Sequence, residues 1–380
     1  MGQIQNLQSP GHPLEIAQEA FVALHYNAVF PAKWDARLGF TCNPIPLVPL
    51  THIQPSGGLV PSTCFLIEKQ YPPIFIEKLL DGSAMMRNQE SEQEAKDIFQ
   101  NKRERIQEEV REKIQNQYTE EELANSEKLD QINQDYHITL EKSFRENSVH
   151  ERNISVLLRL RVSQVTPVKK RNKNGGACIS IWRPGEDLLH QLTPGTIFKV
   201  THLMAKPINS QNGMLHLDST KSSCWAPMGN MYDHASSLHF RMNQMSCDCI
   251  HSLSLERKGH EFDFSGVLVS IQRIDDGGYS VFMVSSNDMK KNGFEDDLPW
   301  LMRIAVGNQC TGLVHLDRAK PSQTLCFQNL SFDFSDVKNC IANVKAGIQS
   351  VITPSVKLCP STSSCMMPRL RDRVESLMLP

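Results

Sequence analysis

Residues 154–182 read ISVLLRLRVSQVTPVKKRNKNGGACISIW. Two runs of alternating apolar and polar residues, Ile154–Val165 and Ala177–Trp182, flank a basic turn that ends in a pair of glycines. Alternation of this kind predicts β-strands with one buried face, and the glycine-containing turn predicts a β-hairpin. The apolar residues of the two runs share the inner face, namely Val156, Leu158, Leu160, Val162, Ile179 and Ile181.

The segments that follow extend this hairpin to a barrel. A short helix is expected over Gly185–Leu192, a third strand over Thr196–Met204, and a closing strand over Met214–Leu217. The order strand, strand, helix, strand is that of a small Greek-key OB barrel, whose open face binds single strands or oligosaccharides. The predicted fold class is therefore mainly β, with tandem OB-fold barrels and an α-helical insertion in one of them.

The polar face of the same hairpin carries candidate binding residues. Arg159 and Arg161 share it with Ser180 and Trp182. A platform for single-stranded nucleic acid needs cations that follow the phosphates and an aromatic face on which bases stack. The turn adds further cations beside the expected groove: Lys169, Lys170, Arg171 and Lys173. Two plainer interpretations stay open, that Trp182 packs at a strand end and that these cations only solvate the hairpin tip.

Charge is distributed unevenly along a chain whose net charge is only −2. Residues 153–228 hold ten lysines and arginines against three aspartates and glutamates, a net charge of +7. Residues 90–150 carry −7 and residues 230–346 carry −3. The basic module coincides with the predicted barrel, which favours a polyanionic ligand there.

A helical arm is predicted within the first barrel. Apolar residues recur every three or four positions over 89–117 and 120–146, while the remaining positions are mostly charged. This pattern indicates an antiparallel helix pair of roughly 40 Å, with Thr119 and Glu122 as a capping box at the turn. Upstream, strands are expected over 63–68, 74–79 and 84–88, and a loop over 29–61 wraps the barrel with Trp34 and Phe40 as anchors.

A second OB-like barrel is predicted downstream. Ser265–Ile274 and Tyr279–Ser285 form a hairpin, and strands over 301–306, 313–315 and 324–332 complete the barrel. Tyr279 and Phe282 are candidate stacking residues, of which strand parity allows only one to face outward. The expected divisions are a remnant of a preceding OB barrel at 1–28, a barrel with the arm inserted at 89–148 within 29–229, a divergent barrel at 230–346, and a disordered tail at 347–380.

No pattern in the sequence indicates an enzyme. The phosphate-binding GxxxxGK and GxGxxG loops are absent, as are the GxSxG and HExxH motifs. The 11 cysteines lack the spacing of a disulfide framework, which indicates reduced thiols. Cys247, Cys249 and His251 are a weak zinc alternative, because they lack a second pair of ligands. We therefore expect no catalytic residues, no metal and no cofactor.

Four segments carry a family resemblance. PAKWDARLGF (31–40), RNQESEQEAKDIFQ (87–100), LLRLRVSQ (157–164) and ISIWRPGEDL (179–188) resemble, in the same order, the DNA-binding domain of the breast cancer type 2 susceptibility protein family. In that family a helical domain precedes three OB barrels, and a helical tower projects from the second. The resemblance implies a second barrel with a shortened tower, a third barrel, and single-stranded DNA binding in the nucleus during homologous recombination.

The resemblance also limits the expected partners. The family contacts its recombinase through repeats with a Phe-x-x-Ala core, which this sequence lacks, so that contact lies outside this chain. The small acidic partner of the family docks on the helical domain and first barrel, which are essentially missing, so we expect it not to bind. From this resemblance we expect the chain to be a fragment, a short isoform or an incomplete gene model. A protein-interaction scaffold with degenerate barrels and no DNA affinity is the alternative function, and no membrane partner is expected.

Overall fold

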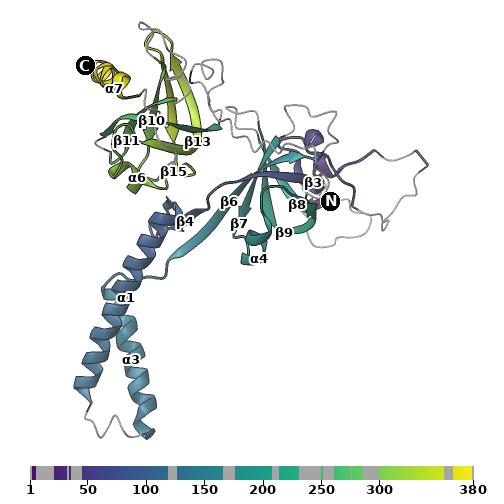
Figure 1. Ribbon diagram of the computed structural model, residues 1–380. Coiled ribbons are helices and arrows are strands. Elements are labelled where there is room, and N and C mark those ends of the chain that lie inside the picture. The colour runs from purple at the N-terminus through teal and green to yellow at the C-terminus, as the bar shows by residue number, and fades with distance from the viewer. Residues whose placement is uncertain are drawn as a thin grey trace. The chain divides into compact units, whose positions relative to one another are not determined.

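The computed structural model describes most of the chain (Figure 1). The described residues are 2–5, 21–31, 34–35, 45–118, 126–165, 176–207, 214–230, 250, 261–274, 276–285, 299–354 and 363–378. They fall into two compact units, one formed by 1–73 with 156–380 and one by 74–155. Among the described helices, none has the length and apolar character needed to span a bilayer.

The first unit contains a closed barrel with the predicted connectivity. Its strands pair in the cyclic order β3, β6, β7, β9, β8 and back to β3. All neighbours are antiparallel except β7 and β9, which are parallel, and α4 (Glu186–Gln191) links β7 to β8. This is the Greek-key topology of an OB fold, as predicted. The strands are β3 (Gly58–Gln70), β6 (Asn153–Gln164), β7 (Gly176–Trp182), β8 (Thr196–Lys206) and β9 (Leu215–Asn230).

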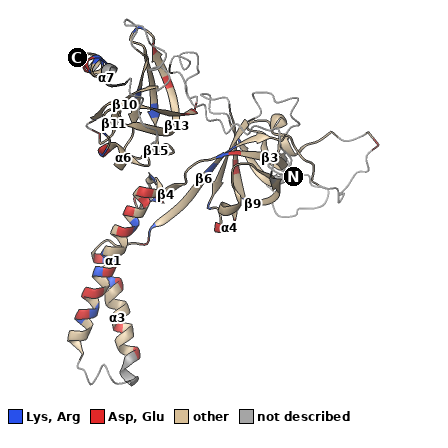
Figure 2. Cartoon of the chain, in the orientation of Figure 1, with Lys and Arg blue, Asp and Glu red and all other residues tan. Residues whose placement is uncertain are grey.

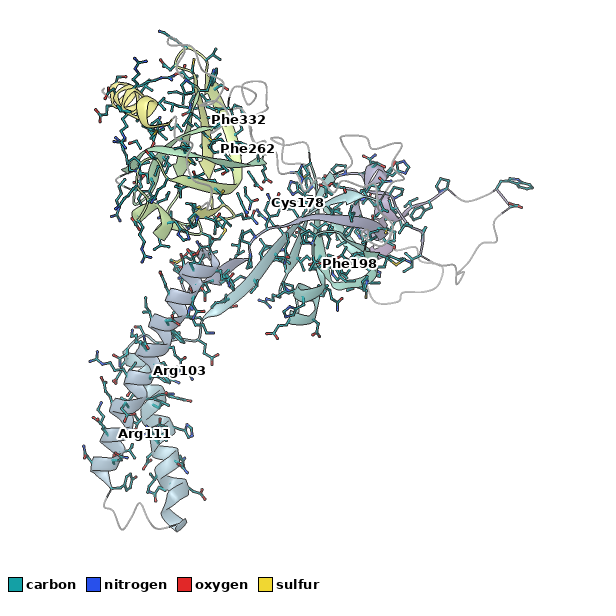
Figure 3. All side chains as sticks on the ribbon, in the orientation of Figure 1. Arg103, Arg111, Cys178, Phe198, Phe262 and Phe332 are labelled. Atoms are coloured by element: carbon teal, nitrogen blue, oxygen red, sulfur yellow. The ribbon has the colours of Figure 1, made fainter. Side chains whose placement is uncertain are left out.

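Alternation along these strands fills the barrel. Leu158, Leu160 and Ile179 are buried inside it with Phe65 and with Phe198, which Figure 3 labels. The ring of Trp225 covers this core edge-on, with ring centroids 6.1 Å from both Phe65 and Phe198. The barrel interior is therefore a closed apolar core, and ligand chemistry must take place on its outer face.

The segment before β3 anchors the barrel with residues other than those expected. Trp34 is 98% exposed and contributes no anchor, while Phe40 lies outside the described residues. Val48, Leu50 and Ile53 enter the core instead, from the short 3₁₀ helix η2 (Leu50–His52) and its flanks. A second 3₁₀ turn, η1 (Tyr26–Ala28), and the hairpin of β1 (Gly2–Gln5) with β2 (Phe21–Leu24) lie upstream. That this region is a remnant of a preceding barrel stays a prediction.

The second unit is a hairpin followed by two helices. β4 (Ile74–Lys78) pairs with β5 (Ala84–Arg87), and α1 (Gln89–Gln117) packs along α3 (Ser126–Glu146). The side chain of Asn88 caps α1 by accepting a hydrogen bond from the Ser91 amide at 2.8 Å. A small apolar core lies between the helices, formed by Ile106, Val110, Ile114 and Ile132. The predicted cap residues Thr119 and Glu122 fall outside the described residues.

Charged residues of both signs cover the outside of these helices (Figure 2). Several form exposed pairs within one helix, such as Arg105 with Glu109 at 3.0 Å and Arg111 with Glu108 at 2.9 Å. Exposed pairs of this kind contribute about 0.3–0.5 kcal/mol each. The helix pair is therefore held mainly by its thin apolar core.

A nearly buried ion cluster ties the start and end of this unit together. Arg152, just before β6, donates to Glu77 of β4 at 2.8 and 3.0 Å and to Glu92 of α1 at 2.8 Å. Arg87 at the end of β5 contacts the same two carboxylates, including Glu92 at 3.5 Å. Hydrogen bonds from Arg152, followed by those from Arg87, lower the pKa of Glu77 to about 2. Two arginines and two glutamates thus neutralise one another at the base of the helix pair.

A second closed barrel follows in the first unit. Its strands pair in the cyclic order β10, β11, β12, β14, β13 and back to β10, with only β12 and β14 parallel. The connectivity repeats that of the first barrel, as predicted for tandem OB folds. The strands are β10 (Glu261–Arg273), β11 (Tyr279–Ser285), β12 (Leu301–Val306), β13 (Thr324–Asp336) and β14 (Ile341–Ala346).

One element of this barrel differs from the sequence prediction. The predicted strand at 313–315 is the helix α6 (Leu313–Asp317), which begins after Gly312 in a left-handed conformation with φ 84°. It occupies the same place between the third and fourth strands as α4 does in the first barrel. The run Leu313–His315 is too short for its hydrophobic periodicity to distinguish a strand from a helix.

The C-terminal segment is more ordered than its composition suggests. Within the predicted disordered tail, β15 (Val351–Pro354) pairs with β13, and α7 (Ser363–Met378) is a helix that packs on the barrel. Serine, proline and methionine dominate the composition of this segment and mask an apolar stripe of helical period. The stripe consists of Met367, Leu370, Val374 and Leu377.

Candidate nucleic-acid interface

The outer face of the first barrel carries a row of five polar residues, one from each strand, three of which are lysine or arginine. Lys69 of β3 lies opposite Arg161 of β6, and Arg161 lies opposite Cys178 of β7, which Figure 3 labels. Cys178 pairs with His216 of β9, which pairs with Lys206 of β8. Residues opposite one another on paired strands have Cβ atoms about 5 Å apart. The row is continuous across the strands, its positive charge comes from Lys69, Arg161 and Lys206, and we call it the belt below.

The predicted platform residues lie on the same outer face beside the belt. Arg159 is opposite Ser180, and Ser180 is opposite Asp218. Trp182 follows at the end of β7, where its amide donates to Ser219 Oγ at 3.1 Å. Its side chain is 46% exposed, whereas Trp225 is the tryptophan that packs on the core. The structure thus brings Arg159, Arg161, Ser180 and Trp182 together, with half of the indole open to a ligand.

Acidic and amide groups partner the cations of the belt and platform. Arg161 Nε lies 3.7 Å from Glu68, Lys69 Nζ 3.3 Å from Asp263, and Lys206 Nζ 3.1 Å from Asp218. Arg159 donates to Gln349 Oε1 at 3.2 Å. Among the described residues, Arg161 Nε is buried and makes no hydrogen bond within the usual distance. Its partner is the Glu68 carboxylate, so Arg161 is held by an ion pair that lacks a hydrogen bond at this nitrogen.

Three other titratable groups of the face, a thiol, an imidazole and a phenol, have pKa values shifted in the direction that favours the uncharged form. Burial raises the pKa of the Cys178 thiol to about 11. Burial, and then the positive charge of Arg159, lower the pKa of His216 below its ordinary value. Burial, followed by the Glu261 carboxylate that Tyr71 hydrogen-bonds, raises the pKa of the Tyr71 phenol well above its usual range. Lysine and arginine side chains thus supply the positive charge of this face.

The other predicted site residues are placed differently. Lys169, Lys170, Arg171 and Lys173 lie outside the described residues, as do Cys247, Cys249 and His251. Tyr279 is buried inside the second barrel and donates a hydrogen bond to Asp317 at 2.5 Å. Phe282 faces outward but is only 2% exposed, because α7 covers it. We therefore do not include either ring in the interface on the first barrel.

Sequence reasoning missed Lys69, Lys206 and His216. Lys69 and Lys206 lie just beyond the expected strands 63–68 and 196–204, whereas His216 lies within the expected closing strand 214–217. Parity within one strand places a residue on a face, but only the register between strands places it in a row. Register across five strands depends on long-range pairing that the sequence pattern does not specify.

The fold and the site together define a tandem OB-fold protein with a basic, partly aromatic outer face on one barrel. No family model matches the chain. Two proteins of Arabidopsis thaliana are similar, Protein BREAST CANCER SUSCEPTIBILITY 2 homolog A and homolog B. They are 26% and 25% identical to it over 266 residues, covering 58% of this chain and 23% of each relative. The similarity is distant, and the chain spans about a quarter of the length of these relatives.

Two solved structures of proteins bound to DNA match the chain at low TM-scores. One is a replication protein A heterotrimer bound to single-stranded DNA, with a TM-score of 0.30, 12% identity, and coverage of 60% of this chain and 49% of that chain. The other is the Ifi202 HINa domain in complex with a 20-base-pair double-stranded DNA, with a TM-score of 0.32, 10% identity, and coverage of 52% and 84%.

Proposed function

We propose that this chain binds single-stranded DNA through the outer face of its first barrel. The observation that carries the proposal is the belt of Lys69, Arg161 and Lys206 beside the half-exposed ring of Trp182. Cations that track a backbone, together with an aromatic face that stacks bases, bind single strands without reading their sequence. An OB barrel uses its outer face and bordering loops for this purpose.

In this proposal the phosphates of the DNA backbone displace protein groups that the cations of this face contact in the free protein. A phosphate is a stronger acceptor for Arg159 than the Gln349 amide, because the hydrogen bond then joins two charged groups. Arg161, next to Arg159 on the outer side of β6, adds positive charge to the same face. The existing contacts hold both guanidinium groups in place before the strand arrives, which reduces the entropy lost on binding.

We further propose a role in repair of double-strand breaks by homologous recombination, as a non-enzymatic module in the nucleus. The support is the distant similarity to the two plant BREAST CANCER SUSCEPTIBILITY 2 homologs and the resemblance of the four sequence segments. Three of the four segments fall in β5 with α1, in β6 and in β7, which form the base of the helical arm and the proposed platform, while 31–40 lies mostly outside the described residues. Contact with a recombinase is expected through regions outside this chain.

Salt titration tests the electrostatic part of the proposal. Each phosphate neutralised on a single strand contributes about −0.7 to the slope of log affinity against log salt concentration. Three to five contacts from the belt and platform give an expected slope of roughly −2 to −3.5 for a labelled oligothymidylate followed by fluorescence anisotropy. Absence of binding at low salt would favour the protein-interaction scaffold instead.

The helical arm is expected to be dispensable for this binding. Replacing residues 90–146 by a short Gly-Ser linker removes an acidic segment that repels phosphates, so the affinity for a single strand should change by less than about twofold. Affinity is measured by anisotropy, and thermal melting of the variant checks that the barrels remain folded. A tenfold loss of affinity in a folded variant would show instead that the arm contacts DNA.

A further inference from the structure

The outer face of the second barrel carries an apolar row that a soluble barrel does not usually expose. Val267 of β10 lies opposite Val284 of β11, which lies opposite Leu301 of β12, which lies opposite Ile341 of β14. None of these side chains belongs to the interior core, which is formed by their sequence neighbours. Four adjacent strands therefore present one continuous apolar band on the outside.

Helix α7 covers this band. Its stripe of Met367, Leu370 and Val374 is buried against the row, and Phe282 of β11 is buried in the same cluster. Polar contacts with the barrel come from Arg373, which donates to the Pro299 carbonyl at 3.0 Å and to the Asn339 carbonyl. The helix is thus held by one apolar stripe and one arginine.

The next row on the same face has the composition of a ligand platform. Phe282 lies opposite Ser270 and Arg303, and Arg303 lies opposite Asn343. The Arg303 guanidinium is exposed and sits 5.9 Å from the centroid of the Phe282 ring. Lys345 extends the basic character one row further along β14. Strands 2 and 3 of an OB barrel, here β11 and β12, are the strands whose face binds oligonucleotides.

We propose that α7 is a cap, formed by the chain itself, that blocks a second single-strand site on the β11–β12 face. With α7 in place, the ring of Phe282 has no surface for a base, although Arg303 beside it is accessible. When α7 leaves, the aromatic ring and the guanidinium together form a stacking platform with a cation. The inference rests on the proposed function, because it assigns the same class of ligand to the second barrel.

Two features of α7 favour its dissociation from the barrel. Pro368 lies within its second turn and removes one backbone hydrogen bond there. An open pocket runs along its β10 side, lined by Val269, Ser270, Ile271, Ala319, Pro321, Arg371 and Glu375. Its packing is therefore incomplete on that side, and its release leaves both the barrel core and the β13–β15 pairing intact.

The cap is tested in the full chain with Trp182→Ala, so that binding by the first barrel is weakened. In this background the double change Leu370→Asp and Val374→Asp should detach α7. Affinity for a labelled oligothymidylate of about 16 nucleotides should then rise at least about tenfold, as expected if the face is covered in nine molecules of ten. Adding Phe282→Ala should abolish the gain. Arg373→Ala should give a smaller gain in the same direction, and Arg369→Ala, an exposed arginine on the same helix, should give none.

The outcomes separate the cap from the proposed function. Unchanged affinity in the detached variant, while the wild-type chain binds the strand, overturns the cap alone. Absence of binding in both the wild type and the detached variant overturns both proposals. If the detached variant aggregates, hydrogen exchange of the wild type decides: saturating oligonucleotide should speed exchange in α7 and protect β11. Unchanged exchange in both elements overturns the cap.

Discussion

Replacing Trp182 with alanine is expected to weaken single-strand binding by about 5- to 150-fold, which corresponds to about 1–3 kcal/mol for the loss of one base–aromatic stack. The indole is half exposed and lies outside the barrel core, so the melting temperature should hardly change. Affinity is measured by anisotropy with an oligothymidylate. In the wild type, quenching of tryptophan fluorescence on addition of the strand reports the same contact.

Trp225 provides the matched control for this change. Its ring packs edge-on against Phe65 and Phe198, so Trp225→Ala removes core packing and should cost about 3–5 kcal/mol of folding stability. Any loss of DNA binding in that variant should follow the fraction of unfolded protein. Normal affinity in a folded Trp182→Ala protein would remove the platform from the site and leave the turn cations Lys169–Lys173 as the candidate.

A substitution at Arg159 tests the electrostatic contribution of the platform separately from base stacking on Trp182. Arg159→Ala should make the salt slope less negative by about 0.7, because one phosphate contact is lost. Stability should change little, since the contact that this guanidinium makes with Gln349 is a single neutral-acceptor hydrogen bond. An unchanged slope in this variant would place Arg159 outside the path of the backbone.

Local patterns in the sequence were sufficient to predict the first barrel. Alternation along β6 and β7 determined which residues are inside, and the order of strands and helix determined the topology. The arm was equally clear, because two long helical stripes leave no alternative period. These predictions succeeded because each depends on residues close together in the chain.

Features that depend on distant residues were predicted poorly. The belt arises from the register of five strands, and Lys69 and Lys206 join it from opposite ends of the barrel sequence. Phe282 has the outward parity that the stacking proposal requires, yet α7, more than 80 residues downstream, buries it. Strand parity gives the face of a residue but not what covers that face. Composition likewise failed for α7, whose apolar stripe is short and interrupted by polar residues.

The ion cluster at the base of the helical arm combines local and distant residues. Glu77, Arg87 and Glu92 are close in sequence, but Arg152 arrives after both helices. The cluster therefore closes the loop that contains the whole arm. Side chains of the four residues are only 9–17% exposed, so their charges are stabilised mainly by one another rather than by water.

Replacing Arg152 with leucine should lower the stability of the arm by about 3–5 kcal/mol, because it leaves Glu77 and Glu92 nearly buried with Arg87 as their one remaining cation in the cluster. Thermal melting followed by the helical circular dichroism signal measures the loss, and Arg105→Ala, which removes an exposed pair, should cost no more than about 0.5 kcal/mol. The pKa of Glu77 is about 2 in the folded unit against an ordinary value of 4.5. Its contribution is therefore complete above pH 4.5 and disappears as the pH falls through 2, so acid should lower the arm's melting temperature in the wild type more than in Arg152→Leu. Equal acid sensitivity in the two proteins would contradict a stabilising role for the cluster.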